Sequence, residues 1–129
     1  MIDVSCAIIK NKEGRVLVTQ RSAIMILPLK WEFPGGKVEV NETAEESLIR
    51  EIREELNIEI KITQVLRPYI HAYPNLTIRL MPFECMHQSG TIKLVEHANF
   101  LWLELAELES LDWAEADLPI LFDYLKQEF

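Results

Sequence analysis

The amino-acid sequence predicts an α/β fold in which helices pack on a mixed β-sheet. Two strand-like segments precede the clearest helical segment, three more follow it, and the chain ends in helical segments. Strands on both sides of a helix, with a further helix at the end, are typical of a sheet covered by helices. With 129 residues and 49% hydrophobic residues, the chain is long enough to bury a core as a single domain over residues 1–129.

The first two strands are expected at residues 2–10 and 15–20, where β-branched side chains are frequent. Residues 11–14 between them read Asn-Lys-Glu-Gly, a turn-forming sequence, so the two strands are predicted to form a hairpin. The next segment, residues 22–36, is expected to be irregular because two prolines and a Gly-Gly pair interrupt it.

Residues 43–57 form the clearest predicted helix. Thr43 is a suitable N-cap, and Glu46, three residues later, completes a capping box. Asn57 can end the helix because asparagine tolerates the left-handed conformation best after glycine. Apolar residues follow the helical period and form one buried stripe, at Leu48, Ile49, Ile52 and Leu56.

Three further strands and two helical segments complete the prediction. The strands are expected at 58–70, 76–86 and 98–104, and Pro82 within the second indicates an edge position or a bulge. The tail is expected to be helical at 104–110 and 115–127. The last helix presents an apolar face made of Leu118, Leu121, Phe122 and Leu125.

The charge distribution is uneven. Thirteen basic residues stand against 21 acidic residues, which gives a net charge of −8. Residues 39–59 carry eight Glu and two Arg, residues 104–129 carry eight acidic residues and one Lys, and these two blocks account for the imbalance. We therefore expect no nucleic-acid polymer and no anionic membrane as a partner, because binding to phosphate backbones depends on neutralisation by Lys and Arg.

Membrane spans and secretion signals are not expected. No run approaches the roughly eighteen apolar residues of a membrane span, and the first ten residues are too short and wrongly flanked for a signal peptide. The two cysteines, Cys6 and Cys85, lie far apart in apolar segments and form no CxxC pair. They could form one disulfide, but two buried free thiols in a cytoplasmic protein are the favoured interpretation.

Three carboxylates share one face of the predicted 43–57 helix. Glu51, Glu54 and Glu55 are spaced i, i+3 and i+4, which places them within about 100° of arc beside the apolar stripe. A cluster of carboxylate oxygens suits a hard cation such as Mg²⁺ or Mn²⁺. The alternative is an ordinary solvated helix face, on which Arg50 and Arg53 pair with neighbouring Glu residues.

The spacing around this helix matches a known motif. From Gly36, five residues lead to Glu42 and seven more lead to Arg50, which is followed by Glu-Ile-Arg-Glu-Glu-Leu-Asn-Ile. This sequence resembles the Nudix box, G-x5-E-x7-R-E-U-x-E-E-x-G-U, in which U is a bulky aliphatic residue. The box spans residues 36–58, and only its last Gly differs, since Asn57 stands there.

Shorter matches extend the resemblance toward both ends of the chain. The sequence of residues 31–37, Trp-Glu-Phe-Pro-Gly-Gly-Lys, is similar to the approach to the box in MutT-type nucleoside triphosphate pyrophosphohydrolases. Other short matches resemble the CTP pyrophosphohydrolase branch of that subgroup, at Gly90-Thr91, Glu96-His97, Leu101-Trp102 and residues 116–119.

The resemblance implies an α/β/α sandwich with a mixed sheet between helices, and a Mg²⁺ cofactor for which Mn²⁺ can substitute. Glu51, Glu54 and Glu55 are then the carboxylate ligands, and the carbonyl of Gly35 is a further one. Glu51 is alternatively the base that activates the attacking water, and the choice among the carboxylates stays open. Glu96 matches an additional ligand or base.

Other residues have supporting roles under the same resemblance. Arg50 orients the box carboxylates through a bidentate contact, and Glu42 is a supporting residue in the same group. Arg21 and Lys37 are candidates to hold phosphates. Asp117, which resembles a base-reading position, is alternatively a cap of the last helix before a proline.

The base is expected to be bound by Glu32, Phe33 and Asp117. Ionised, Asp117 could accept two hydrogen bonds from a guanine-like edge; protonated, it could donate to N3 of cytosine while accepting from N4. MutT uses an Arg at the position of Leu76, so recognition of an oxidised guanine by that route is not expected.

These features together predict a Mg²⁺-dependent enzyme that cleaves a ribo- or deoxyribonucleoside triphosphate to the monophosphate and pyrophosphate. CTP, dCTP or a modified deoxynucleotide is the favoured substrate. The alternatives are a Nudix hydrolase of another nucleoside diphosphate derivative, such as an ADP-sugar or a dinucleoside polyphosphate, and a non-catalytic nucleotide-binding module. The partner is a small nucleotide, and the chain is expected to be a monomer or homodimer.

Several residues receive no functional role from the sequence. The three histidines, His71, His87 and His97, have no zinc-binding spacing and are expected at the surface or at strand edges. Trp102 and Trp113 are expected to pack in the core.

Overall fold

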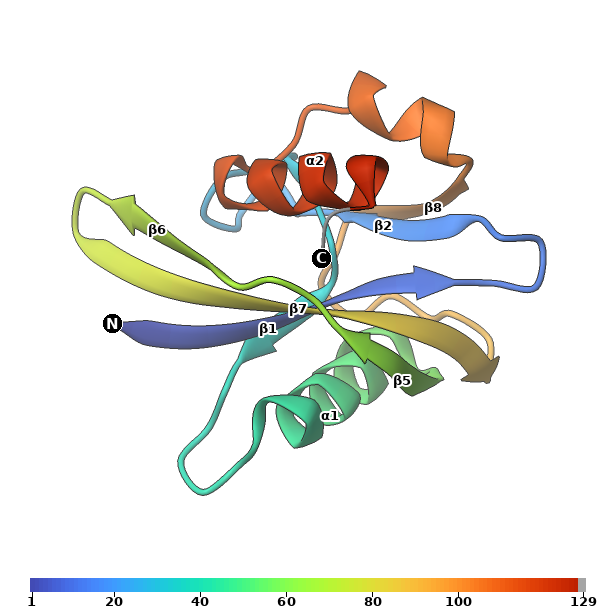
Figure 1. Ribbon diagram of the computed structural model, residues 1–129, viewed down its shortest axis with the longest axis horizontal. Coiled ribbons are helices and arrows are strands. Elements are labelled where there is room, and N and C mark those ends of the chain that lie inside the picture. Colours follow the sequence, from blue (N-terminus) through green and yellow to red (C-terminus); the bar gives the residue numbers. More distant parts are fainter. Residues whose placement is uncertain (128–129) are drawn as a thin grey trace.

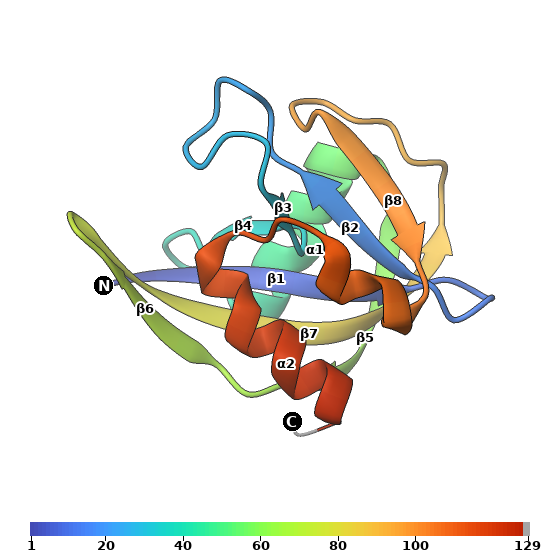
Figure 2. The same cartoon turned by 90° about the horizontal axis from the view of Figure 1, so that it is seen from above.

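The computed structural model describes residues 1–127 and contains an eight-stranded mixed sheet between helices (Figure 1). Helix α1 (Ala44–Leu56) lies on one face of the sheet, and α2 (Leu118–Lys126) lies on the other. Seen from above, α2 crosses over β1 and β7 (Figure 2). The predicted mixed sheet between helices is therefore confirmed. The predicted domain extends to residue 129, and its last two residues lie outside the described part.

Two long strands form the centre of the sheet. β1 (Ile2–Lys10) and β7 (Leu76–Ser89) run parallel, with Ile2 opposite Ile78 and Lys10 opposite Met86. On its other side, β1 pairs with β4 near its start and with β2 at its end. The shorter strands are antiparallel to their partners: β2 (Val16–Gln20), β3 (Trp31–Glu32), β4 (Gly35–Lys37), β5 (Glu59–Val65), β6 (Tyr69–Tyr73) and β8 (Asn99–Leu103).

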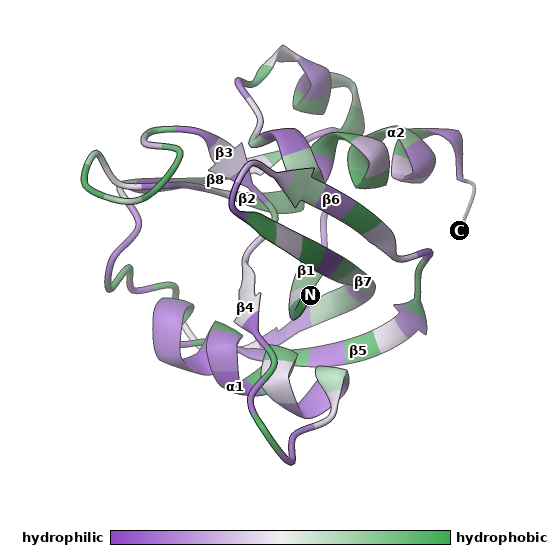
Figure 3. Cartoon of the chain, turned by 90° about the vertical axis from the view of Figure 1, so that its left-hand side faces the viewer, coloured by the Kyte–Doolittle hydropathy of each residue, from purple (hydrophilic) through white to green (hydrophobic). Residues whose placement is uncertain are grey.

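Alternation along β1 supplies both layers of the core. Cys6 and Ile8 join the cluster under α2, whereas Ala7 and Ile9 join the cluster under α1. Successive strand residues point to opposite faces, so a strand buried on both sides reads as a continuous apolar run. Hydropathy instead alternates along β5 and β6 (Figure 3), which is typical of strands with one exposed face.

Helix α1 begins and ends as the sequence predicts. The Oγ1 of Thr43 accepts from the backbone N–H of Glu46 at 3.1 Å, and the Glu46 carboxylate accepts from the N–H of Thr43 at 2.9 Å. Asn57 takes a left-handed conformation with φ 61° and donates its N–H to the carbonyl of Arg53. Leu48 and Ile52 are fully buried, and Glu51, on the face beside this stripe, meets Gly36 of β4.

The predicted strand at 58–70 is wrong as a single element. β5 ends at Val65 and β6 begins at Tyr69, with Pro68 in the interruption. Both strands pair with β7, so β7 has partners on both sides and Pro82 is not at a sheet edge. The carbonyl of Pro82 accepts from the N–H of Leu66, which lies between β5 and β6. Because the partner strand is interrupted there, the absent N–H of Pro82 removes no hydrogen bond from the sheet.

Two other segments differ from the prediction. Residues 22–36, expected to be irregular, contain the short strands β3 and β4. A Cβ at Gly35 would lie 1.9 Å from the carbonyl oxygen of Ser5, so only glycine lets β4 approach β1 this closely. The tail holds a 3₁₀ helix η1 (Leu105–Ser110), a 3₁₀ turn η2 (Glu115–Asp117) and α2.

The cysteine prediction is confirmed, because Cys6 and Cys85 are both buried and unbonded within the described chain. Trp113 is buried as expected, and Trp102 packs partly buried against the cluster under α1. Among residues 1–127, no helix combines the length and apolar character that a membrane crossing requires.

Candidate active site

A cavity of about 680 Å³ opens between the sheet, the loop after β2 and the η2 turn. Apolar side chains such as Ile78 and Leu80 form much of its wall, and Glu55 and Asp117 are among its polar residues. Six of the residues predicted to act in function line it, namely Arg21, Glu32, Phe33, Gly35, Glu55 and Asp117. An apolar cleft with few convergent polar groups is typical of a small-molecule site.

Arg50 gathers three carboxylates beside this cavity. Its Nη1 donates to Oε1 of Glu51 at 3.0 Å and to Oε2 of Glu54 at 3.1 Å. Its Nε and Nη2 donate to the two oxygens of Glu42 at 2.7 and 3.0 Å. This contact, with the N–H of Glu39, lowers the pKa of Glu42 to about 2. Arg50 thus fixes the orientation of the carboxylates, as expected of a residue that positions metal ligands.

Arg53 is not part of this group. Its guanidinium donates to both carboxylate oxygens of Glu59, at 2.6 and 2.7 Å, on the exposed side of the helix. The ordinary solvated pairing that the sequence allows for both arginines therefore holds for Arg53. Arg50 instead reaches across to the residues of the box.

Gly36 makes room for the carboxyl group of Glu51. A Cβ at this position would lie 2.3 Å from Cδ of Glu51 and 2.5 Å from its Oε2. The first residue of the box and its first helical carboxylate are therefore in direct contact. This explains in steric terms why a glycine is needed at position 36.

The carboxyl group of Glu55 has a strongly raised pKa. Its Oε2 is buried and has no hydrogen-bond partner among residues 1–127. Burial, followed by the neighbouring Glu51 carboxylate, raises the pKa of Glu55 well above its usual range, and Glu32 and Glu96 act in the same direction. Crowded carboxylates are unfavourable unless a proton or a cation neutralises part of their charge.

The donor set fits a divalent cation by its chemistry. Glu51, Glu54 and Glu55 offer carboxylate oxygens, the ligands that Mg²⁺ prefers, and one oxygen of Glu55 is buried without a hydrogen-bond partner among residues 1–127. Within the described chain, no group of three or more His, Cys, Asp or Glu side chains is arranged to hold a metal ion. Arg50 holds Glu51 and Glu54 in this arrangement.

Five predicted residues do not line the main cavity, namely Lys37, Arg50, Glu51, Glu54 and Glu96. Glu96 is exposed in the loop before β8 and lines a smaller pocket of about 460 Å³ with Ser22 and Met25. Figure 2 shows this loop and the loop after β2 at the same edge of the sheet. Lys37 is exposed at the end of β4, where its carbonyl accepts from the Ser47 hydroxyl at 3.2 Å.

One wall of the cavity holds a chain of three polar side chains. Nη1 of Arg21 donates to Oε1 of Glu32 at 2.8 Å, and Nε2 of His97 lies 2.9 Å from Oε2 of Glu32. Nε of Arg21 also donates to the carbonyl of Ile26 at 2.5 Å. The prediction that His97 lies at the surface is wrong, since its side chain is only 2% exposed.

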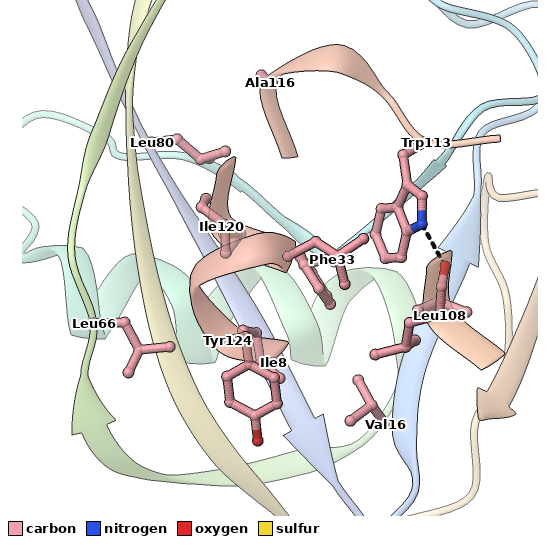
Figure 4. Packing of buried hydrophobic residues seen from close by; sticks show 13 residues of the cluster. Ile8, Val16, Phe33, Leu66, Leu80, Leu108, Trp113, Ala116, Ile120 and Tyr124 are labelled. Carbon is pink, nitrogen blue, oxygen red and sulfur yellow. Dashed lines mark hydrogen bonds between the residues drawn. The ribbon is translucent and has the colours of Figure 1, made fainter. Parts of the chain in front are cut away.

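Phe33 and Asp117 also line the cavity and are joined by a hydrogen bond. The backbone N–H of Phe33 donates to Oδ2 of Asp117 at 2.8 Å, and the Phe33 ring packs on Trp113 with ring centroids 4.8 Å apart (Figure 4). Burial, followed by the Glu32 carboxylate, raises the pKa of Asp117 to about 8. Asp117 is the N-cap residue of α2, as its alternative role predicts, but within residues 1–127 its side chain makes no capping bond to that helix.

Several lining residues were not predicted to act at the site. Tyr73 ends β6 and Asn75 lies in the turn between β6 and β7, and both reach the cavity only because β6 folds back along β7. The Tyr-Pro-Asn sequence indicates a turn, but it does not indicate which residues lie beside that turn in the fold.

The other two histidines contact aromatic side chains. His87 stacks on Trp102 with ring centroids 5.7 Å apart, and His71 packs edge-on to Tyr73.

In a comparison with known protein families, residues 1–124 match the family described as the NUDIX domain. The chain belongs to the Nudix family. It is therefore a Nudix hydrolase, and the resemblance seen in the box is confirmed. Arg50, Glu51, Glu54 and Glu55 all lie within the matched region.

Individual relatives of this Nudix hydrolase match over most of their length. It is 35% identical over 121 residues to the CTP pyrophosphohydrolase of Escherichia coli K12, covering 94% of this chain and 89% of that relative. It is 28% identical over 120 residues to the 8-oxo-dGTP diphosphatase of the same organism, covering 93% of each.

Solved structures agree with the sequence relatives. The solution structure of the E. coli ORF135 protein superposes with a TM-score of 0.86 at 33% identity, covering 98% of this chain and 89% of that chain. The crystal structure of the MutT protein from Methanosarcina mazei Go1 has a TM-score of 0.86 at 25% identity, covering 98% and 94%. The α/β/α arrangement of the Nudix fold is thus shared along the described chain.

Proposed function

We propose that this Nudix hydrolase cleaves a ribo- or deoxyribonucleoside triphosphate to the monophosphate and pyrophosphate, with CTP, dCTP or a modified deoxynucleotide favoured. One observation carries the proposal. A single cavity joins the crowded carboxylate Glu55 to the buried polar pair of Glu32 and Asp117. A nucleotide matches these two parts of the cavity. Its phosphates need a cation, which the carboxylates can hold, and its base needs a flat apolar slot with a few polar groups.

The phosphate end works through charge. A triphosphate carries about four negative charges at neutral pH, so acidic residues alone would repel it, and bound Mg²⁺ inverts this field and activates water. Glu51, Glu54 and Glu55 would hold the cation, with the Gly35 carbonyl and Glu96 as further donors. Arg50 keeps the first two in place. Arg21 and Lys37 are the proposed phosphate contacts, and which carboxylate acts as the base stays open.

The base end works through hydrogen bonds and stacking. Oδ2 of Asp117 already accepts from the N–H of Phe33, which leaves its other oxygen for the base. With its pKa raised to about 8, Asp117 carries a proton at neutral pH and donates from that oxygen. A donor suits N3 of cytosine and opposes N1–H of guanine, while the nearby Glu32 carboxylate can accept from an exocyclic amine. Phe33 lines the slot.

The Asp117→Asn variant tests this base contact. Asn keeps an oxygen for the Phe33 N–H and presents a donor at every pH, whereas Asp117 loses its proton as pH rises through about 8. We expect the preference of the native enzyme for CTP over GTP to fall between pH 7 and pH 9. The preference of the variant should stay constant, and its turnover of CTP at pH 7 should change less than about tenfold. Steady-state kinetics on both nucleotides measure this.

Asp112→Asn is the matched control, because Asp112 is 73% exposed and pairs with Lys30 outside the cavity. It should leave the pH dependence of base preference unchanged. Equal losses of Asp117→Asn on all nucleotides at all pH values would show a structural role for Asp117 instead.

Metal removal tests the phosphate end. We expect excess chelator to abolish turnover, Mg²⁺ to restore it and Mn²⁺ to substitute. Binding should also be seen without substrate, as a rise in melting temperature when Mg²⁺ is added, because a ligand that binds the folded state stabilises it. The Glu55→Gln variant should lose that rise. Full turnover in excess chelator would contradict the metal assignment.

The cellular setting follows from the same features. We propose a cytoplasmic enzyme, since two buried free thiols persist in a reducing compartment. Its partner is a small nucleotide rather than a nucleic-acid polymer, and the expectation of a monomer or homodimer stays a prediction.

A further inference from the structure

His97 is a buried histidine to which neither the metal group nor the base contacts assign a role. It lies in the loop before β8, and its side chain is 2% exposed. Its neighbour Ala98 donates its N–H to the carbonyl of Gln20 at 2.9 Å, so the backbone beside His97 is held against the end of β2. A histidine buried in this way normally serves a partner, and the partner here is Glu32.

The Glu32 carboxylate is gripped at both oxygens. Arg21 donates to Oε1 at 2.8 Å, and His97 lies 2.9 Å from Oε2. The two partners come from different segments, so the carboxyl plane cannot rotate without breaking one of the contacts. Glu32 is itself only 15% exposed. A carboxylate held this way keeps free lone pairs and accepts a further hydrogen bond with little loss of side-chain freedom.

The remaining ring nitrogen of His97 indicates which proton is present. Nδ1 is buried and has no hydrogen-bond partner in the part of the chain that the structure describes. With the proton on Nε2, His97 donates to Glu32 and leaves only an acceptor unpaired. With the proton on Nδ1, a lone pair would face the carboxylate and a buried donor would be unpaired. The contact therefore favours His97 as a donor to Glu32.

We propose that His97 is a positioning residue for base discrimination, which orients Glu32 as a fixed acceptor for an exocyclic amino group of the nucleobase. The inference rests on the proposed function and extends it. The ligand chemistry is an amino-bearing base, such as cytosine, as opposed to an oxo-bearing base of the same shape, such as uracil. CTP and UTP differ in this group at C4 and also at N3, which Asp117 is proposed to contact. The change in their ratio of kcat/KM when His97 is replaced and Asp117 is kept therefore reports the Glu32 contact.

Two amide variants of His97 form a matched pair. Gln places its amide nitrogen about where Nε2 of histidine lies, whereas Asn places it about where Nδ1 lies and falls short of Glu32. We expect His97→Asn to lower the CTP-to-UTP ratio of kcat/KM at least about tenfold, the factor set by one hydrogen bond. We expect His97→Gln to stay within about threefold of the native ratio. Turnover of UTP and activation by Mg²⁺ should change little in either variant.

His87→Asn is the control, since His87 contacts Trp102 and the carbonyl of Gly90 rather than Glu32. Equal losses on CTP and UTP in His97→Asn would overturn the proposal, because they indicate a role in the fold or through the adjacent Glu96. So would a native ratio near one, or a His97→Gln ratio as low as that of His97→Asn.

Binding separates this proposal from the proposed function. The ratio of dissociation constants for CMP and UMP is measured for the native protein and both variants, which requires no catalysis. If the native protein hydrolyses no ribo- or deoxyribonucleoside triphosphate, the proposed function fails, and the binding ratios still decide whether His97 supports discrimination of the amino group. The same tenfold fall in His97→Asn and recovery in His97→Gln are expected.

Discussion

Replacing Glu54 with Gln is expected to lower the rate of pyrophosphate release at least about a hundredfold while the protein stays folded. Residues that only support metal ligands typically cost ten- to a hundredfold when they are changed, so a direct ligand should reach the upper end. The Glu54 side chain is 59% exposed and its contact with Arg50 lies at the surface, so its loss should shift the melting temperature by no more than about 2 °C. Pyrophosphate release and thermal unfolding measure the two effects.

Glu45→Gln provides the control for Glu54. Glu45 is exposed in the first turn of the same helix and lies outside the carboxylate group that Arg50 holds. Its variant should keep native turnover. Near-native turnover of Glu54→Gln under saturating Mg²⁺ would remove Glu54 from the proposed ligand set.

Replacing Gly36 with Ala is expected to cause a comparable loss by steric means. The new Cβ would lie 2.3 Å from Cδ of Glu51, so the carboxyl group of Glu51 must move. A displacement of about 1 Å in a reacting site can cost about a hundredfold in rate. The clash is with the end of a flexible side chain, so the fold should tolerate it. The expected result is a large fall in kcat with little change in melting temperature.

Gly35→Ala separates this effect from a general intolerance of Cβ atoms on β4. There the added atom would meet the backbone carbonyl of Ser5 at 1.9 Å, so the pairing of β4 with β1 must shift. We expect Gly35→Ala to lower the melting temperature strongly, which Gly36→Ala should not do. Native turnover of Gly36→Ala would contradict the assignment of Glu51 to the reacting centre.

Local signals allowed the acidic helix to be predicted from the sequence. The capping box of Thr43 and Glu46, the apolar stripe and the C-terminal Asn57 each lie within one helix, and all three are present. Because helical geometry is fixed, the register of the carboxylates followed from the position of the stripe. The contact between Arg50 and Glu42 can be predicted in the same way, because the two residues are only eight positions apart in the sequence.

The walls of the cavity could not be predicted in the same way. Asp117 meets the N–H of Phe33 across 84 residues, and His97 meets Glu32 across 65. Neither pairing leaves a periodic pattern, so Asp117 could be read as a helix cap and His97 as a surface residue. For Pro82 the sequence allowed an edge position or a bulge, and the edge position is wrong because β7 has partner strands on both sides.

The two acidic blocks of the sequence now differ in meaning. In residues 39–59, Arg50 links Glu42, Glu51 and Glu54 beside the cavity, and the donor chemistry fits a cation. In residues 104–129, Asp117 lines the cavity, and within the described chain most of the other acidic side chains are exposed. The block at residues 39–59 therefore belongs to the proposed phosphate-binding end of the cavity. Its negative charge would repel a polyanion such as a triphosphate unless a metal ion is bound with it.

Identification of the products formed from CTP in the presence of Mg²⁺ tests the central claim most directly. The proposed function predicts CMP and pyrophosphate in equal amounts, and slower turnover of ADP-ribose and of dinucleoside polyphosphates under the same conditions. Release of CDP and orthophosphate would contradict it, as would turnover confined to ADP-ribose or to a dinucleoside polyphosphate.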